Sequence, residues 1–346
     1  MRISQLQETL AQLGAKPVHI DRILRAWLKG RPLDAGPRKH AAAQTLPLTV
    51  RAALPELAQG LQNLATVVER HSDPDGSARL LVRLADGQHV ESVQLPKAGV
   101  CVSTQVGCAV GCAFCMTGKS GLLRQLQSGE ILAQVLCVAN VKRVVFMGMG
   151  EPAHNLENVC EAIDALGIWG GIGHKNLVFS SVGDPRIFPR LLAGRVKPAL
   201  ALSLHSTQVS LRRSLLPKAP DISPEALVAA GEAYARATGY PIQYQWTLLA
   251  GINDGEEELA GIERLLKGKY AMLNLIPYNE NPGLAYQRPA LPAIVAMTRR
   301  LNRAGILTRI RYSAGQEVEG GCGQLSGIRD QMSGIRNQNR TVPERP

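Results

Sequence analysis

The sequence is poor in aromatic residues and contains no apolar run that could cross a membrane. Phe, Trp and Tyr make up 4% of the 346 residues, which argues against a surface built mainly from base-stacking platforms. No stretch approaches the roughly 18 uncharged apolar residues that a membrane helix needs. The first ten residues lack the apolar segment of a secretory signal, and no repeat or low-complexity segment is visible. We therefore expect a cytoplasmic protein with no membrane partner.

The composition is that of a folded, basic protein. Apolar residues account for 45% and charged residues for 19%, which excludes disorder throughout and supplies enough material for a core. The chain has 39 Lys and Arg against 28 Asp and Glu, a net charge of +11. This charge suits an anionic partner, nucleic acid first, although an enzyme that is merely basic has the same composition. Seven cysteines in a cytosolic chain indicate metal or redox chemistry rather than a disulfide framework.

Helical spacing dominates the first part of the chain. It is interrupted by a Pro- and Gly-broken basic stretch with Arg31, Arg38, Lys39 and His40. We predict that residues 1–72 form a small helical accessory domain that binds RNA. Its basic residues either contact phosphates or form a solvated face.

A change of period from Ala78 onward marks a β-hairpin. Two alternating runs, 78–84 and 89–95, flank Asp86-Gly87, a strong short-range hairpin signal. We assign residues 73–99 to a β-hairpin extension.

Short apolar runs then alternate with amphipathic helical stretches over residues 100–325. This spacing argues for parallel strands joined by right-handed crossovers. The candidate strands are 100–103, 143–147, 176–180, 198–205, 242–249, 272–277 and 307–311. Six or so strand–helix units suffice for an open barrel and are too few for a closed eight-stranded one. The predicted fold class is α/β, a partial (βα)6 barrel, followed by a flexible basic tail at 326–346.

Three cysteines stand close together in the segment GCAVGCAFCMTGKSG. Cys108, Cys112 and Cys115 have the spacing C-x-x-x-C-x-x-C, and Gly107 and Gly111 allow the bends that wrap such a loop around a soft metal centre. Structural zinc normally needs a fourth Cys or His, and none lies nearby in the sequence. A cubane iron–sulfur cluster on three thiolates keeps one iron open. From the residues alone, zinc and three unrelated buried cysteines are the alternatives.

The three-cysteine loop resembles the signature of radical S-adenosylmethionine (SAM) enzymes. Together with VVFMGMGEP, ALSLH, NLIPYN and GGCGQL, in this order between about Ala78 and Leu325, it resembles the RlmN/Cfr family of RNA adenosine methyltransferases. The resemblance implies a partial (βα) radical SAM barrel. It also implies a [4Fe-4S] cluster on Cys108, Cys112 and Cys115, whose open iron chelates the amino and carboxylate groups of SAM.

The same resemblance implies a set of SAM-binding residues, which follow the predicted strands. The C-terminal ends of parallel strands are where barrel enzymes build their sites. The set comprises Gly150, Glu151, Ser180, Ser203, Leu204, His205 and Asn279. Gly150 and Glu151 are expected near the amino group of SAM. Taken alone, His205 would be interpreted as a structural histidine. The run GMGEP alone would be interpreted as the Gly-rich turn that commonly follows a strand.

Three further residues match the family's catalytic groups. Cys322 in GGCGQL matches the cysteine that SAM first methylates, Cys101 in CVSTQ matches the cysteine that releases the product, and Glu91 in VESVQLP matches the carboxylate that takes the ring proton. Without these motifs, each cysteine would be interpreted as an ordinary buried thiol. Glu91 would be interpreted as a solvated surface residue. The implied cycle passes through a protein–RNA adduct and leaves a disulfide bond that an external reductant resets.

The implied activity is methylation at C2 of an adenosine in 23S rRNA, with tRNA as a further candidate substrate. The sister activity at C8, which confers ribosomal antibiotic resistance, is not separated from it by any local residue. A non-catalytic iron–sulfur RNA-binding protein is the alternative from another class. The expected electron donor is a low-potential protein such as flavodoxin, and the expected state is a monomer.

Three departures from the family pattern concern the substrate rather than the chemistry. The segment before Arg143 is short, Gly320-Gly321 stand where small alanines are usual, and Met116 follows the cluster motif. We interpret the chain as RlmN-like, with a divergent paralogue as the alternative to the housekeeping enzyme.

Overall fold

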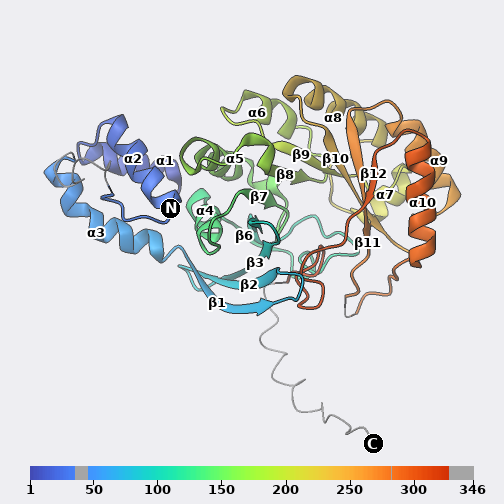
Figure 1. Cartoon of the computed structure of the whole chain (residues 1–346), viewed down its shortest axis with the longest axis horizontal. Coiled ribbons are helices and arrows are strands. Elements are labelled where there is room, and N and C mark those ends of the chain that lie inside the picture. The colour runs from blue at the N-terminus through green and yellow to red at the C-terminus, as the bar shows by residue number, and fades with distance from the viewer. Residues whose placement is uncertain (36–45, 282, 327–346) are drawn as a thin grey trace, which may run out of the picture.

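A ten-stranded sheet runs through the molecule and carries helices along its outer side (Figure 1). The computed structural model describes residues 1–35, 46–281 and 283–326. The predicted tail, apart from Ser326, and the basic residues Arg38, Lys39 and His40 therefore lie outside the described residues. Within the described ranges, no helix combines the length and apolar character needed to span a bilayer.

The N-terminal part contains three helices and then a strand. The helices are α1 (Ile3–Gln12), α2 (Pro17–Leu28) and α3 (Leu48–Gln62). Residues 65–72, which the sequence placed in the helical accessory region, instead form the strand β1 (Ala65–Ser72). This strand pairs antiparallel with β2 (Ala78–Leu84). Its alternately exposed residues belong to the edge of the sheet.

The hairpin predicted around Asp86-Gly87 is confirmed. β2 pairs antiparallel with β3 (His89–Leu95), and Gly87 has a φ of +84°, the left-handed region that this tight turn requires. β3 continues the sheet into β4 (Gly99–Cys101), which begins the parallel part.

The parallel strands follow one another in chain order from β4 to β12, and the sheet does not close on itself among the described residues. They are buried on both faces, which explains their continuous apolar runs. After β4, the strands are β7 (Arg143–Phe146), β8 (Leu177–Ser181), β9 (Ala199–Ser203), β10 (Ile242–Leu248), β11 (Ala271–Pro277) and β12 (Thr308–Ile310). A separate antiparallel pair, β5 (Gln105–Gly107) and β6 (Leu122–Gln125), frames the cysteine loop.

Helices connect these strands on the outer side. They are α4 (Ser128–Leu136), α5 (Leu156–Ala165), α6 (Ile187–Ala193), α7 (Val209–Leu215), α8 (Pro224–Thr238), α9 (Glu256–Leu266) and α10 (Leu291–Arg303), with short turns η2 (Pro152–Asn155), η3 (Leu166–Gly170) and η4 (His174–Asn176). The bounds of α8 follow from its caps. Ser223 Oγ accepts the N–H of Ala226 at 3.1 Å, and Gly239 ends the helix with a φ of +74°.

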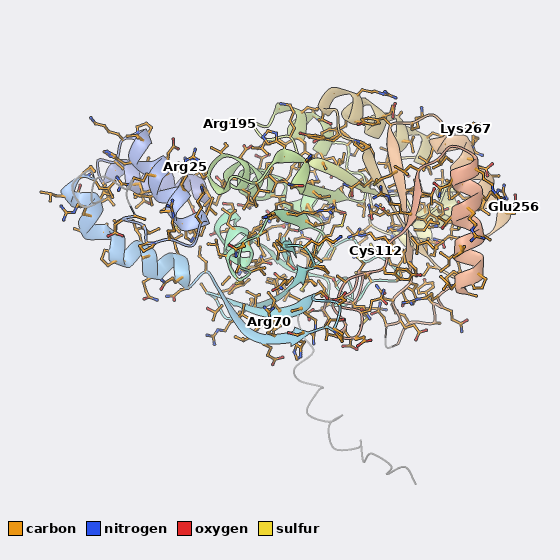
Figure 2. The ribbon with its side chains drawn as sticks, viewed as in Figure 1. Arg25, Arg70, Cys112, Arg195, Glu256 and Lys267 are labelled. Carbon is orange, nitrogen blue, oxygen red and sulfur yellow. The ribbon has the colours of Figure 1, made fainter. Side chains whose placement is uncertain are left out.

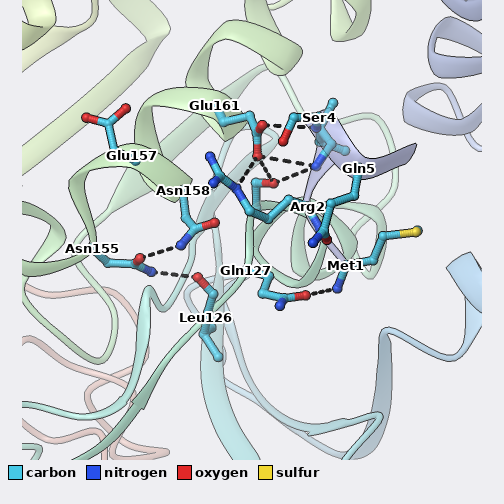
Figure 3. A network of polar contacts seen from close by, with 12 residues as sticks. Met1, Arg2, Ser4, Gln5, Leu126, Gln127, Asn155, Glu157, Asn158 and Glu161 are labelled. Atoms are coloured by element: carbon cyan, nitrogen blue, oxygen red, sulfur yellow. Dashed lines mark hydrogen bonds and ion pairs between the residues drawn. The ribbon is translucent and has the colours of Figure 1, made fainter. Parts of the chain in front are cut away.

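The N-terminus of α1 is bound to the barrel by a polar network (Figure 3). The N–H groups of Ile3 and Ser4 donate to Ser128 Oγ and to Glu161 Oε1, each at 2.9 Å. Arg2 pairs with Glu161 at 3.5 Å. A carboxylate here satisfies helix N–H groups that lack an intrahelical partner and complements the helix dipole. The N-terminal helices share one apolar core with the barrel, so the two are packed together.

Candidate active site

The C-terminal ends of β7 and β8 are joined through Glu151. Its Oε1 accepts the N–H of Ala153 at 3.0 Å, and its Oε2 accepts the N–H of Val182 at 3.1 Å. Gly150 has a φ of +98°, and a Cβ there would lie 2.6 Å from the side chain of Gln105. Gln105 in turn accepts the N–H of Glu151 at 2.7 Å. The Gly-Glu pair is thus fixed against the strand that enters the cysteine loop. Burial raises the pKa of Glu151 to about 7.

His205 lies at the next strand end in an unusual backbone conformation. Its φ is +59°, a region that non-glycine residues seldom adopt. Its Nδ1 accepts the N–H of Thr247 at 3.0 Å, and burial lowers its pKa to about 3. The ring is therefore neutral with its proton on Nε2. Phe114 of the cysteine loop packs edge-on against it, with ring centroids 4.9 Å apart.

The other residues of the predicted SAM set lie on the same rim. Ser180 in β8 and Ser203 at the end of β9 are half-buried, and Leu204 is fully buried with its N–H on the carbonyl of Gln245 at 3.0 Å. The ends of three neighbouring strands, β7 to β9, therefore carry these side chains together.

One buried residue of this rim escaped the sequence analysis. Arg212 of α7 is 4% exposed, and its Nη2 donates to the carbonyls of Val182 at 2.5 Å and Ser203 at 3.2 Å. Its Nε is buried with no hydrogen-bond partner. A buried guanidinium with neutral partners and an unused donor is costly unless an anion completes it. A lone arginine in a short helical stretch gives no sequence signal of this kind.

The cysteine loop is shaped by glycines. Gly107 has a φ of +78°, and a Cβ on it would lie 2.0 Å from the carbonyl oxygen of Gly121, which accepts the N–H of Cys108 at 2.9 Å. Gly111 also has a positive φ, +65°, as its predicted role in a tight bend requires. An apolar cluster that includes Val110, Phe114 and Tyr278 covers the loop, and the three cysteines pack against it.

The chemistry of Cys108, Cys112 and Cys115 suits a soft cationic centre. Burial raises the pKa of all three thiols, that of Cys108 to about 12, and neighbouring thiols add to the effect. Iron would supply the positive charge that these groups need as thiolates. Among the described residues no three side chains are close enough to hold a single metal ion. A cubane cluster does not require the three thiolates to converge on one ion, because each thiolate binds a different iron of the cluster. These residues therefore fit the cluster.

The loop that carries Cys322 is hydrogen-bonded to the cysteine loop. Thr117 Oγ1 donates to the carbonyl oxygen of Leu325 at 2.6 Å. The N–H of Met116 donates to the carbonyl oxygen of Gly323 at 2.8 Å. Asn279, predicted to contact SAM, donates its amide to the carbonyl of Cys322 at 3.0 Å and to Ser313 Oγ at 2.9 Å. In this structure Asn279 therefore positions the Cys322 loop.

Gly321 explains one departure from the family pattern. A Cβ on this residue would lie 2.7 Å from Asn279 Nδ2 and 2.6 Å from Gln324 Oε1. The usual alanine would fit here only if these side chains or the loop shifted.

Cys101, Cys115 and Cys322 line one cavity of about 130 Å³. Cys101 ends β4, and Cys322 reaches the cavity from the C-terminal loop. A wider groove of about 1010 Å³ lies between α2, α3 and α4, remote from these thiols. All seven cysteines are free, so the predicted disulfide bond is not supported.

Glu91 is buried rather than exposed on its hairpin. It is 1% exposed, its Oε1 pairs with Arg79 Nη1 at 2.6 Å, and its Oε2 accepts the N–H of Ser326 at 2.6 Å. Glu91 lies on the same face of β3 as Val93, which lines the thiol cavity. The predicted base is thus next to the cavity, held by a cation and by the end of the Cys322 loop.

Comparison with known proteins agrees with this arrangement. A family model described as the radical SAM superfamily matches residues 102–261. A protein of Stutzerimonas stutzeri named probable RNA methyltransferase is 63% identical over 339 residues, 97% of this chain and 99% of that protein. One from Methylibium petroleiphilum with the same description is 64% identical, over 94% of this chain and 92% of that protein. The crystal structure of a radical SAM methyltransferase from Sphaerobacter thermophilus matches with a TM-score of 0.81 and 33% identity, over 94% of this chain and 98% of that one.

Proposed function

We propose, since this chain belongs to the radical SAM methyltransferase family, that it methylates C2 of an adenosine in 23S rRNA, with tRNA as a further candidate substrate. The observation that carries the proposal is the shared cavity of Cys101, Cys115 and Cys322. Methyl transfer by simple displacement needs no thiol pair. Carbon transfer through a methylated cysteine needs two thiols beside the cluster, and that is what the cavity offers.

The superfamily implies a [4Fe-4S] cluster and SAM as cofactors. Cys108, Cys112 and Cys115 would hold the cluster. The rim residues that would hold SAM are Gly150, Glu151, Ser180, Ser203, Leu204, His205 and Asn279, and we add Arg212. When bound, these cofactors supply the methyl group and remove one hydrogen atom from it.

The remaining chemistry falls to three side chains of this protein. Cys322 carries the methyl carbon and bonds it to the adenine ring, and Glu91 takes the ring proton. The one unpaired electron left by these steps would return to the oxidised cluster. The Cys101 thiolate then attacks the sulfur of Cys322. The S–S bond forms, the S–C bond breaks, and its electron pair passes to the carbon, which takes up a proton. The product is a methylated base and an oxidised thiol pair, which an external thiol reductant returns to two free thiols.

Arg212 should contribute to SAM binding through its unused Nε–H. We expect Arg212→Gln to bind SAM about tenfold more weakly, because a charge-assisted contact to the carboxylate is lost. Binding of decarboxylated SAM should change little, which separates recognition of the carboxylate from general damage. Calorimetric titration of the reconstituted protein measures both. Equal weakening for both ligands would contradict this role.

RNA is the partner that the names of the relatives suggest. Figure 2 shows Arg25 of α2 on the side of the N-terminal helices toward the barrel, Arg70 on the edge strand β1, and Cys112 in the barrel. Basic residues on this part would bind phosphates and orient the RNA toward the barrel. A monomer and a low-potential donor such as flavodoxin complete the proposal.

Nucleoside analysis of treated RNA tests the proposed function. Unmodified 23S rRNA, reconstituted enzyme, SAM and a low-potential reductant should yield C2-methyladenosine, and tRNA is tested in parallel. Detection of a C8-methylated nucleoside instead would show that the enzyme has the sister activity and not the proposed one. Absence of any methylated adenosine from an enzyme that cleaves SAM would overturn the proposal.

A further inference from the structure

Arg311 is the one charged side chain among the described residues that line the thiol cavity. It follows β12 directly and is half-buried. Its Nη1 donates to Gln245 Oε1 at 2.8 Å and contacts Met147 Sδ at 3.7 Å. Its backbone N–H donates to the carbonyl of Leu275 at 2.8 Å. Both side-chain partners are neutral, so the cavity contains a fixed positive charge that these contacts do not cancel.

The geometry connects this charge to Cys101. Cys101 pairs with Val145 across β4 and β7, and Met147 stands on the same face of the chain two residues later. Arg311 therefore reaches the wall of the cavity on which Cys101 lies. Burial raises the pKa of Cys101 to about 12, and Cys322 adds to this, whereas the N–H of Met147 and the charge of Arg311 act in the opposite direction.

Few other charged side chains lie near the Cys101 thiol among the described residues. Cys322 and Cys115 face the cavity from two loops. The nearby cation Arg79 is paired with Glu91 on the neighbouring strands β2 and β3. A thiolate is the form that attacks a sulfur atom, and an adjacent arginine favours it.

We propose that Arg311 is a positioning residue for product release, in that its guanidinium stabilises the negative charge of Cys101 before the attack on Cys322. The attack itself rests on the proposed function. The stabilisation of the thiolate is a property of this chain alone and is tested without substrate.

The first experiment follows alkylation of Cys101 by iodoacetamide in the anaerobic holoenzyme. Peptide mass spectrometry gives the rate at each pH. We expect Arg311→Met to slow labelling about tenfold at every pH measured, because a smaller fraction of Cys101 is then thiolate. Arg311→Lys, which keeps the charge, should recover most of the rate.

Matched controls separate this effect from a change in packing. Arg309→Met removes an exposed arginine two residues earlier on the same strand and should leave the profile of Cys101 unchanged. Cys137, half-buried after α4, should be labelled at the same rate in every variant. An unchanged labelling rate in Arg311→Met, or an equal slowing in Arg309→Met, would overturn the proposal.

A second experiment uses SAM and RNA. Slower release should make Arg311→Met accumulate a covalent protein–RNA adduct severalfold above the wild type. If Cys101→Ala accumulates the adduct and Arg311→Met does not, Arg311 has no part in release. If no variant forms an adduct, the proposed function fails, and the labelling experiment still decides whether Arg311 stabilises the thiolate.

Discussion

Replacing Cys101 by alanine is expected to trap a covalent protein–RNA species that survives denaturation. Cys101 and Cys322 line the same cavity, but the roles proposed for them are sequential. Without Cys101, Cys322 can still be methylated and can still join its carbon to the ring, whereas release cannot follow. Turnover should fall to a single event per protein at most. Nuclease digestion and mass spectrometry should find one nucleotide on the peptide that contains Cys322.

Cys322→Ala should fail earlier and so give a different result. It lacks the atom that carries the carbon and should form no adduct, while cluster content and SAM binding remain normal. The double variant should behave like Cys322→Ala, because an early block hides a later one. Full turnover in either single variant, or no adduct in a Cys101→Ala protein that cleaves SAM, would refute the thiol mechanism.

Removal of a cluster cysteine should have an equally large effect. Cys112→Ala leaves two thiolates where a cubane with one open iron needs three. The wild-type protein, purified without oxygen, should be brown with about four irons per chain. The variant should lose the colour, most of the iron and all SAM cleavage. Iron analysis and visible absorption measure this.

Cys137→Ala is the matched control for this experiment. This half-buried thiol lies at the end of α4 and lines the wide groove rather than the thiol cavity. Its loss should leave iron content and SAM cleavage unchanged. One equivalent of zinc and no iron in the reconstituted wild type would contradict the assignment of the loop.

The parts of the fold that could be predicted depend on local signals. The turn at Asp86-Gly87 and the alternation beside it predict β2 and β3 to the residue. The alternating strands and helices predict the α/β barrel, and the radical SAM fold is confirmed by the family model and the solved structure. β1 escaped prediction because its polar residues, such as Glu69 and Arg70, give no apolar alternation, and its order comes from pairing with β2.

For the candidate site, the sequence predicts only those residues that belong to a motif. The motifs predict roles for Cys101 and Cys322, and only the fold brings these residues to one cavity across more than 200 residues of chain. Asn279 is predicted as a SAM contact, and the fold adds a hydrogen bond from its amide to the Cys322 loop that no motif predicts. Arg212 and Arg311 have no motif at all. Their significance comes from burial and from partners on distant strands, which no local pattern encodes.

The most direct test of the central claim counts deuterium in the product methyl group. In the proposed cycle the carbon loses one hydrogen while it is on Cys322 and takes up a proton when Cys101 releases it. With SAM that carries a fully deuterated methyl group, in ordinary water, mass spectrometry of the methylated adenosine should therefore find two deuterium atoms in the methyl group. Three deuterium atoms would show that the methyl group moves intact, and this would contradict transfer through Cys322.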